Sequence, residues 1–151
     1  MCIRDSSNAS LADVKAVWSL AGASLRFEYV QNEFNLLATT DAQELIPWCA
    51  EHGLRYTAFS PLAGGLLTGK YRLGEAPPPG SRLAHAADIY SGYLNEESFA
   101  AIEQLRQEAA ERRETVAEAA LGFVLDTRGL DGLIVAPRRV EQFASMGFKA
   151  Q

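Results

Sequence analysis

Cysteine, basic charge and long apolar runs are all scarce in this chain of 151 residues. The only cysteines are Cys2 and Cys49, so no disulfide framework or CxxC metal site can be drawn, and a reducing compartment is expected. Lys and Arg total 14 against 19 Asp and Glu, which gives a net charge of -5 and a pI near 5.0. Nucleic acids and anionic membranes need a basic face, so we expect neither as a partner.

Apolar runs such as residues 133–136 are far shorter than the ~20 residues of a bilayer crossing, and no charged-then-apolar leader is evident. We therefore expect a cytoplasmic protein that binds small molecules. Residues 1–6 show no periodicity and are interpreted as a non-native or disordered leader, leaving one domain over residues 7–151. With 48% hydrophobic and 22% charged residues, the composition is that of an ordinary globular domain.

The spacing of apolar residues predicts helices that alternate with strands. Helices are expected over residues 11–21, 40–53, 95–113 and 115–124, and another begins at Val140. Strands are expected over residues 25–31, 54–60 and 132–136, the last apolar throughout and so buried on both sides. Residues 64–94 contain three consecutive prolines and several glycines, which predicts a long loop of the kind that often carries function.

This alternation is typical of an α/β fold with a parallel sheet covered by helices. Periodicity alone leaves two architectures open, a doubly wound sheet and part of a closed (β/α)8 barrel. Both bind ligands at the carboxyl ends of their strands, where Gln31, Phe59, Ser60 and Arg138 are expected to lie.

Residues 64–70 (GGLLTGK) fit the G-x-x-x-x-G-K part of a phosphate-binding P-loop. The next residue is Tyr71, where the P-loop needs a Ser or Thr hydroxyl for magnesium. Lys70 also leads into a proline-rich segment instead of opening a helix. Both departures argue against a nucleoside triphosphatase.

Four blocks in chain order give a more specific interpretation. They are Ser7-Asn8, residues 30–37 (VQNEFNLL), residues 58–71 (AFSPLAGGLLTGKY) and residues 136–139 (APRR). In content and spacing these blocks resemble the aldo-keto reductase family, over roughly residues 7–146. The resemblance implies the C-terminal part of a single (β/α)8 TIM barrel, from the end of strand five through strand eight.

The resemblance also implies a nicotinamide cofactor and the residues that bind it. Ser7, Asn8 and Gln31 would hydrogen-bond the nicotinamide carboxamide, with groups that both donate and accept. Phe59 would stack on the nicotinamide ring. The pyrophosphate region would be lined by Ser60, Leu62, Gly64 and Leu66.

Arg138 matches the position that meets the adenosine 2'-phosphate, a bidentate task that suits a guanidinium, and Gln142 lies nearby in the sequence. The resemblance therefore favours NADPH (NADP) over NADH. It implies NAD(P)H-dependent reduction of aldehydes or ketones to alcohols, with a small carbonyl compound as substrate.

The family's catalytic Asp, Tyr, Lys and His lie on strands that would precede Ser7. Tyr29, Tyr56 and Tyr71 match none of those positions, and neither His52 nor His85 matches the family's histidine. We therefore expect no catalytic residue and no metal ligand in this chain, which would carry cofactor-binding elements of a parent enzyme and be inert alone. A strand edge would be left unpaired.

Plainer interpretations stay open for single residues. Gln31 could satisfy backbone groups at the strand end, Phe59 could belong to the core, and Arg138 could be solvated. Two further functions also stay open: a non-enzymatic, cofactor-binding regulatory subunit resembling potassium-channel beta subunits, and a half-barrel that no longer binds any ligand. The sequence predicts neither the substrate's identity nor the oligomeric state.

Overall fold

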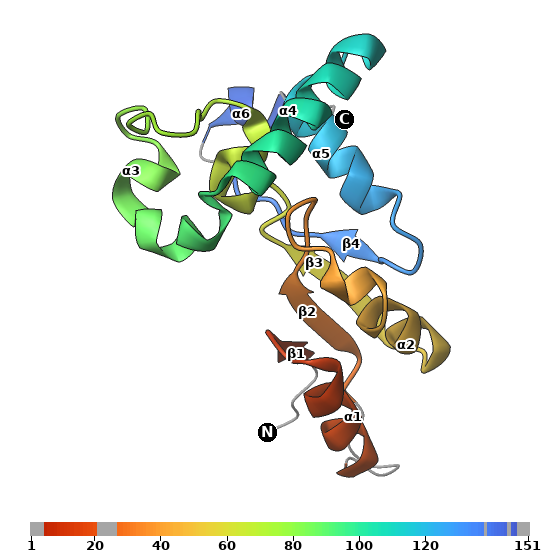
Figure 1. The fold of residues 1–151 in the computed structure, drawn as a ribbon. Helices are drawn as coiled ribbons and strands as arrows, with labels where there is room; N and C mark the ends of the chain where they lie inside the picture. The colour runs from red at the N-terminus through yellow and green to blue at the C-terminus, as the bar shows by residue number, and fades with distance from the viewer. Residues whose placement is uncertain (1–4, 21–26, 138, 145, 148–151) are drawn as a thin grey trace.

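The computed structural model describes residues 5–20, 27–137, 139–144 and 146–147. At its centre is a parallel sheet whose strands follow the chain order, β1-β2-β3-β4 (Figure 1). The strands are β1 Asp5–Ser7, β2 Tyr29–Glu33, β3 Arg55–Phe59 and β4 Gly132–Leu133. This sheet, with helices in its connections, confirms the predicted α/β class.

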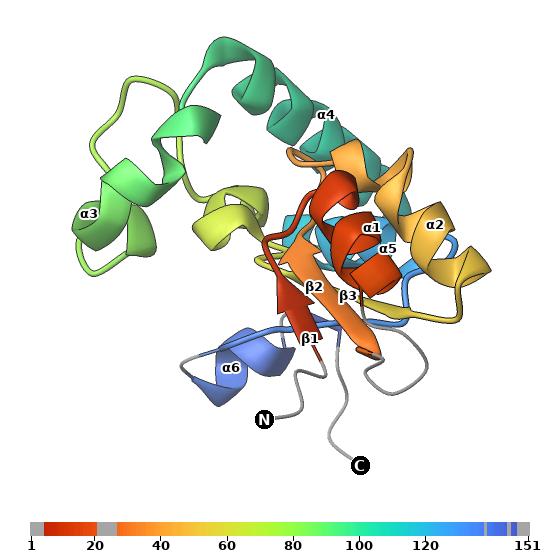
Figure 2. The same cartoon turned by 90° about the horizontal axis from the view of Figure 1, so that it is seen from below.

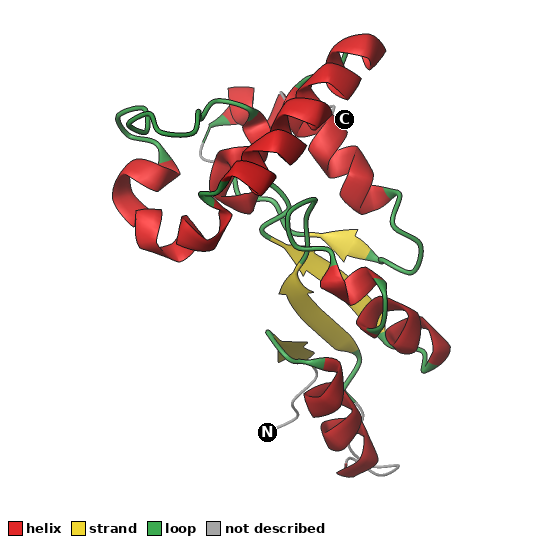
Figure 3. Ribbon diagram, viewed as in Figure 1, coloured by secondary structure: helices red, strands yellow, loops and turns green. Residues whose placement is uncertain are grey.

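The connections contain helices of very different lengths. They are α1 Leu11–Leu20, α2 Leu45–Glu51, α3 Arg82–Ala86, α4 Glu96–Arg112, α5 Val116–Leu125 and α6 Val140–Ala144, with 3-10 helices η1 Thr40–Ala42, η2 Ala63–Thr68 and η3 Ala87–Tyr93. The longest connection follows β3, where the chain leaves the sheet before returning as β4 (Figure 3). Within the described ranges, no helix combines the length and apolar character needed to cross a bilayer.

Helices α1, α2 and α5 pack against one face of the sheet (Figure 2). The strand side chains on that face, including Val30, Tyr56 and Ala58, are fully buried. Strand residues alternate between faces, so Gln31 and Thr57 point to the opposite face, where both are only half-buried. A doubly wound sheet is covered by helices on both faces, so this one-sided cover favours the barrel.

Local capping explains why several helices begin where the sequence predicts. The Ser98 amide donates to Asn95 Oδ1 (2.9 Å) at the start of α4. Thr115 and Glu118 form a reciprocal capping box at α5. Ser10 Oγ accepts from the Asp13 amide (3.2 Å) and caps α1. These bonds satisfy amides that have no partner inside their helices.

The predicted strand over residues 132–136 is wrong in length and in burial. β4 contains only Gly132 and Leu133, and Ile134 is 44% exposed. The Ile134 amide still donates to the Ala58 carbonyl (2.8 Å). The ladder then ends because its partner β3 turns away at Ser60, which has a left-handed backbone (φ 53°).

Other boundaries move for equally local reasons. β2 runs to Glu33 rather than ending at residue 31, because its pairing with β3 continues to Glu33↔Phe59. The helix expected over residues 40–53 is divided into η1 and α2; Pro47 lacks an amide hydrogen, so α2 can begin at most one turn before it. Short helices occur within the predicted loop over residues 64–94. β1 begins at Asp5, so it includes the last two residues of the segment interpreted as a leader.

Candidate functional site

A cavity of about 670 Å³ lies where β3 and β4 end. Its lining comes from the end of β3 with the turn and η2 that follow, from the loop after η2 with the α3–η3 segment, from the start of α5, and from the chain that runs from β4 through α6. Glu33 at the end of β2 completes it. The carboxyl ends of parallel strands are the ligand-binding end of α/β folds, so this cavity is the candidate site.

The turn after β3 has an unusual backbone. Ser60 (φ 53°), Ala63 (φ 45°) and Gly64 (φ 65°) all lie in the left-handed region, which costs a non-glycine residue on the order of 1 kcal/mol. The fully buried Asn35 stabilises this turn: its amide nitrogen donates to the Ser60 carbonyl (3.1 Å), and its oxygen accepts from the Leu37 amide (2.8 Å). A buried side chain thus holds the backbone of Ser60, which lines the cavity.

Two glycines in this turn leave room for neighbouring side chains. A Cβ at Gly64 would clash with the ring of Tyr90, which lies directly against the backbone there. A Cβ at Gly65 would lie 3.1 Å from Nζ of Lys70, whose ammonium also lies 5.1 Å from the ring centroid of Tyr71. The sequence requires glycine here so that the backbone and these two side chains can approach the cavity.

The cavity has positive charge at one part of its wall and a carboxylate at another. Lys70 and Arg82 both line it, and neither forms an ion pair with a described residue. Glu33 lies opposite Phe59 in the β2–β3 register. Burial, and then the negative charge of the nearby Glu33 carboxylate, raise the pKa of Tyr93 to about 12. Tyr93 is therefore neutral at physiological pH.

Five of the residues proposed from the sequence line this cavity. They are Phe59, Ser60, Leu62, Gly64 and Gln142. Leu66 is not among them, since its side chain is fully buried in a core cluster with Leu67 and Ile102. The side chain of Gln142 also accepts a hydrogen bond from the Arg139 amide (3.2 Å) at the start of α6.

Ser7, Asn8 and Gln31 form a second group outside the cavity lining. Ser7 pairs with Gln31 in the β1–β2 register, and the Asn8 amide donates to the Gln31 carbonyl (3.1 Å). Gln31 and Glu33 are two residues apart in β2 and so share one face of the sheet. The structure thus brings these three residues together, next to Glu33 at the cavity edge. Arg138 lies outside the described residues.

The sequence interpretation did not assign Lys70 or Arg82 to the site. The position of Lys70 directly after a glycine-rich run could have indicated that it belongs to the site. Nothing in the sequence around Arg82 indicates this, since a proline-rich segment separates it from that run and only the fold brings it to the cavity wall. Among the described residues, no cluster of His, Cys, Asp or Glu could hold a metal ion.

Comparison with known proteins agrees with this architecture. The model of the aldo/keto reductase family matches residues 6–146. An uncharacterized oxidoreductase of Bacillus subtilis, YrpG, is 38% identical over 74% of this chain and 32% of its own length. A probable voltage-gated potassium channel subunit beta of Arabidopsis thaliana is 29% identical over 90% of this chain and 43% of its own length. The chain thus spans less than half the length of these curated relatives.

A solved structure shows the same fold. The glycerol dehydrogenase of Gluconobacter oxydans superimposes with a TM-score of 0.67 over 92% of this chain and 41% of its own, at 24% identity. This likeness confirms that the sheet is part of a (β/α)8 barrel. The family match covers most of the chain, and the blocks that line the cavity lie within it. The chain belongs to the aldo/keto reductase family.

Proposed function

We propose that this chain binds NADPH as part of an aldo/keto reductase that reduces aldehydes or ketones. The observation that carries the proposal is the cavity at the carboxyl ends of the strands. Phe59 and a glycine-containing left-handed turn meet there with Lys70 and Arg82, two cations that form no ion pair with a described residue. Members of this family generally use NAD(P)H, which supplies the hydride when bound.

The chemistry of the described residues fits such a cofactor. Phe59 offers an aromatic face for the nicotinamide ring, and Ser7, Asn8 and Gln31 offer donors and acceptors for its carboxamide. Ser60, Leu62 and Gly64 form the wall for the pyrophosphate, whose negative charge Lys70 and Arg82 would neutralise. The proposed preference for the 2'-phosphate of NADPH depends on Arg138, with Gln142 nearby.

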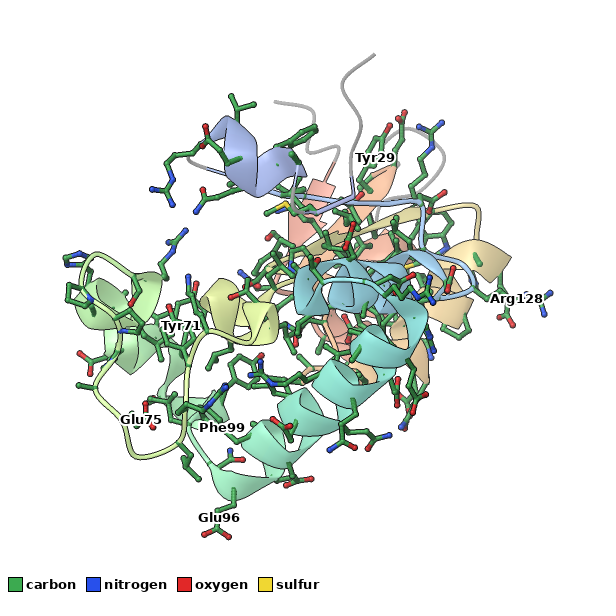
Figure 4. All side chains as sticks on the ribbon, turned by 90° about the horizontal axis from the view of Figure 1, so that it is seen from above. Tyr29, Tyr71, Glu75, Glu96, Phe99 and Arg128 are labelled. Atoms are coloured by element: carbon green, nitrogen blue, oxygen red, sulfur yellow. The ribbon has the colours of Figure 1, made fainter. Side chains whose placement is uncertain are left out.

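We propose that none of Tyr29, Tyr56 and Tyr71 is the acid of the reaction. Tyr56 is fully buried and donates to Asp41, and Tyr71 accepts from the Leu83 amide. Tyr29 accepts from Arg55 (2.9 Å) and lies far from Tyr71 (Figure 4). Since these hydroxyls are engaged in separate places, the chain is proposed to supply cofactor binding without turnover. The cytoplasmic location stays a prediction from composition.

Fluorescence titration of the chain with NADPH and with NADH tests this function. We expect saturable NADPH binding, weakened about tenfold or more by Arg138→Ala because a charge-assisted phosphate contact is lost. NADH should bind equally to both proteins, since it lacks the 2'-phosphate. Failure of a folded chain to bind either cofactor would contradict the proposal, and carbonyl reduction by the chain alone would contradict the absence of catalytic groups.

A second function is favoured by one comparison. The potassium channel subunit from Arabidopsis matches over 90% of this chain, more than YrpG does. A non-enzymatic, cofactor-binding regulatory role would use the same cavity. Activity of the parent protein separates the two: turnover of a carbonyl substrate supports the reductase, whereas cofactor binding without turnover supports the regulatory subunit.

A further inference from the structure

The turn at the end of β1 is held by one side chain from β2. The backbone ladder between these strands ends where the Asn8 amide donates to the Gln31 carbonyl (3.1 Å). The Asn32 side chain then continues the pairing: its Oδ1 accepts from the Ala9 amide (3.1 Å), and its Nδ2 donates to the Ala9 carbonyl (2.9 Å). An asparagine amide can replace a backbone peptide in this way because it both donates and accepts.

The conformation between these bonds is one that an L-residue adopts reluctantly. Asn8 has a positive φ of 54°, and its side chain is exposed. Asparagine tolerates this region better than most residues, but exposure means that packing does not enforce it. Among the interactions described, those that enclose Asn8 are the ladder bond to Gln31 and the two bonds between Ala9 and Asn32.

Asn32 is itself fixed in one orientation. It is 8% exposed, and its Nδ2 also donates to Asp41 Oδ2 (2.8 Å). The same Asp41 oxygen accepts from the hydroxyl of the fully buried Tyr56 (2.7 Å). If the Asn32 side-chain amide were rotated by 180°, its oxygen would face the Asp41 carboxylate and its NH2 group would face the Ala9 backbone N–H. Asp41 therefore selects the orientation of Asn32 that holds Ala9.

We propose that Asn32, oriented by Asp41 and Tyr56, is a positioning residue for the carboxamide end of the cofactor site. It acts by holding Ser7 and Asn8 beside Gln31 and needs no contact with the cofactor. This inference rests on the proposed function, because it assumes that these three residues meet the nicotinamide carboxamide. It predicts that the nicotinamide end depends on Asn32, whereas the pyrophosphate end, held by Asn35, does not.

Two ligands separate positioning from general stability: NADPH, and 2'-phospho-ADP-ribose, which lacks the nicotinamide ring. For Asn32→Ala we expect NADPH affinity to fall about tenfold, as the turn no longer presents its hydrogen-bonding groups, with unchanged affinity for 2'-phospho-ADP-ribose. Asp41→Asn, which retains the Asn32 bonds to Ala9 but loosens the amide's orientation, should show the same selectivity with a smaller fold-change. Amide hydrogen exchange should be faster at Ala9 in both variants.

Asn35→Ala is the matched control, because Asn35 is also a buried asparagine but holds the turn after β3. It should weaken both ligands. An equal loss of both ligands in Asn32→Ala, or no loss of NADPH affinity in a variant whose Ala9 amide exchanges faster, would overturn the inference and leave the proposed function standing. Binding of neither ligand by the unsubstituted, folded chain would overturn the proposed function, and the inference with it.

Discussion

The turns that follow β1 and β3 differ in how far they are buried, although both are proposed to meet one cofactor. The turn after β3 is anchored in a core, since Ala63, Leu66 and Leu67 are fully buried within it. In the turn after β1, Ser7 and Asn8 are exposed, and the Asn32 side chain provides the clamp. Packing, together with the hydrogen bond from Asn35, therefore fixes the proposed phosphate end of the site, whereas side-chain hydrogen bonds from Asn32 fix the proposed nicotinamide end.

The largest expected effect comes from breaking the turn after β3 at Gly64. In Gly64→Ala the new methyl group would clash with the ring of Tyr90 at a positive φ, so we expect a loss of about 3 kcal/mol in the free energy of unfolding. Gly53→Ala is the matched control: it has φ +69° with no heavy atom within 4 Å, and should cost only about 1 kcal/mol.

Urea denaturation gives the free energy of unfolding of both variants. Hydrogen exchange of the Ala9 amide in Gly64→Ala shows whether the turn after β1 is affected. We expect the exchange rate of this amide to be unchanged under native conditions, because no described contact joins Gly64 to Ala9. Equal destabilisation by the two glycine substitutions would mean that the clash with the Tyr90 ring adds nothing to the loss of stability in Gly64→Ala.

A smaller effect should follow from removing charge at the phosphate end. Lys70→Ala should weaken NADPH binding about tenfold and reduce its dependence on salt, because the exposed ammonium is proposed to neutralise phosphate. Its effect on stability should be small. Lys15→Ala, which changes an exposed lysine on α1, is the control. NADPH titrations of both variants at two salt concentrations test this prediction. The same NADPH affinity and salt dependence in Lys70→Ala and Lys15→Ala would show that Lys70 does not contribute to cofactor binding.

The smallest effect concerns Glu33, which connects the two regions. The pKa of Tyr93 is raised by burial and by Glu33 from its ordinary value of 10.0 to about 12. Because the folded state holds this proton more tightly, the associated stability is present below pH 10 and is lost as the pH rises towards 12. Urea denaturation between pH 9 and 12 should therefore show falling stability, with a shallower fall in Tyr93→Phe.

Burial also raises the pKa of Cys49 to about 11, and it raises the pKa of Tyr56, so part of the alkaline loss should persist in Tyr93→Phe. Cys49→Ala is compared with Tyr93→Phe, since the loss of stability due to the Cys49 thiol falls at lower pH, between 9 and about 11. A pH profile that is the same in Tyr93→Phe and in the unsubstituted chain would show that folding does not raise the pKa of Tyr93.

Features with local causes were predictable from the sequence. α4 and α5 begin after Asn95 and Thr115, because capping depends on residues three positions apart. The blocks that resemble the family also placed Phe59, Ser60, Leu62 and Gly64 at one site, and all four line the cavity.

Features set by distant partners were not predictable. β4 is short because β3 turns away at Ser60, and the apolar residues 132–136 contain no information about that turn. Leu62 and Leu66 belong to the same motif, yet Leu62 lines the cavity and Leu66 is in the core, since the left-handed residues between them redirect the chain. Arg82 reaches the cavity only through the tertiary path of the segment after Gly69.

The most direct test of a single cofactor site formed by both turns is an NMR titration of the isotope-labelled chain with NADPH. If both turns form one site, we expect saturable amide shift changes over residues 60–70 together with changes at Asn8 and Gln31, all with one dissociation constant. Changes confined to the turn after β3, or saturating at a different concentration from those at Asn8, would contradict a shared site.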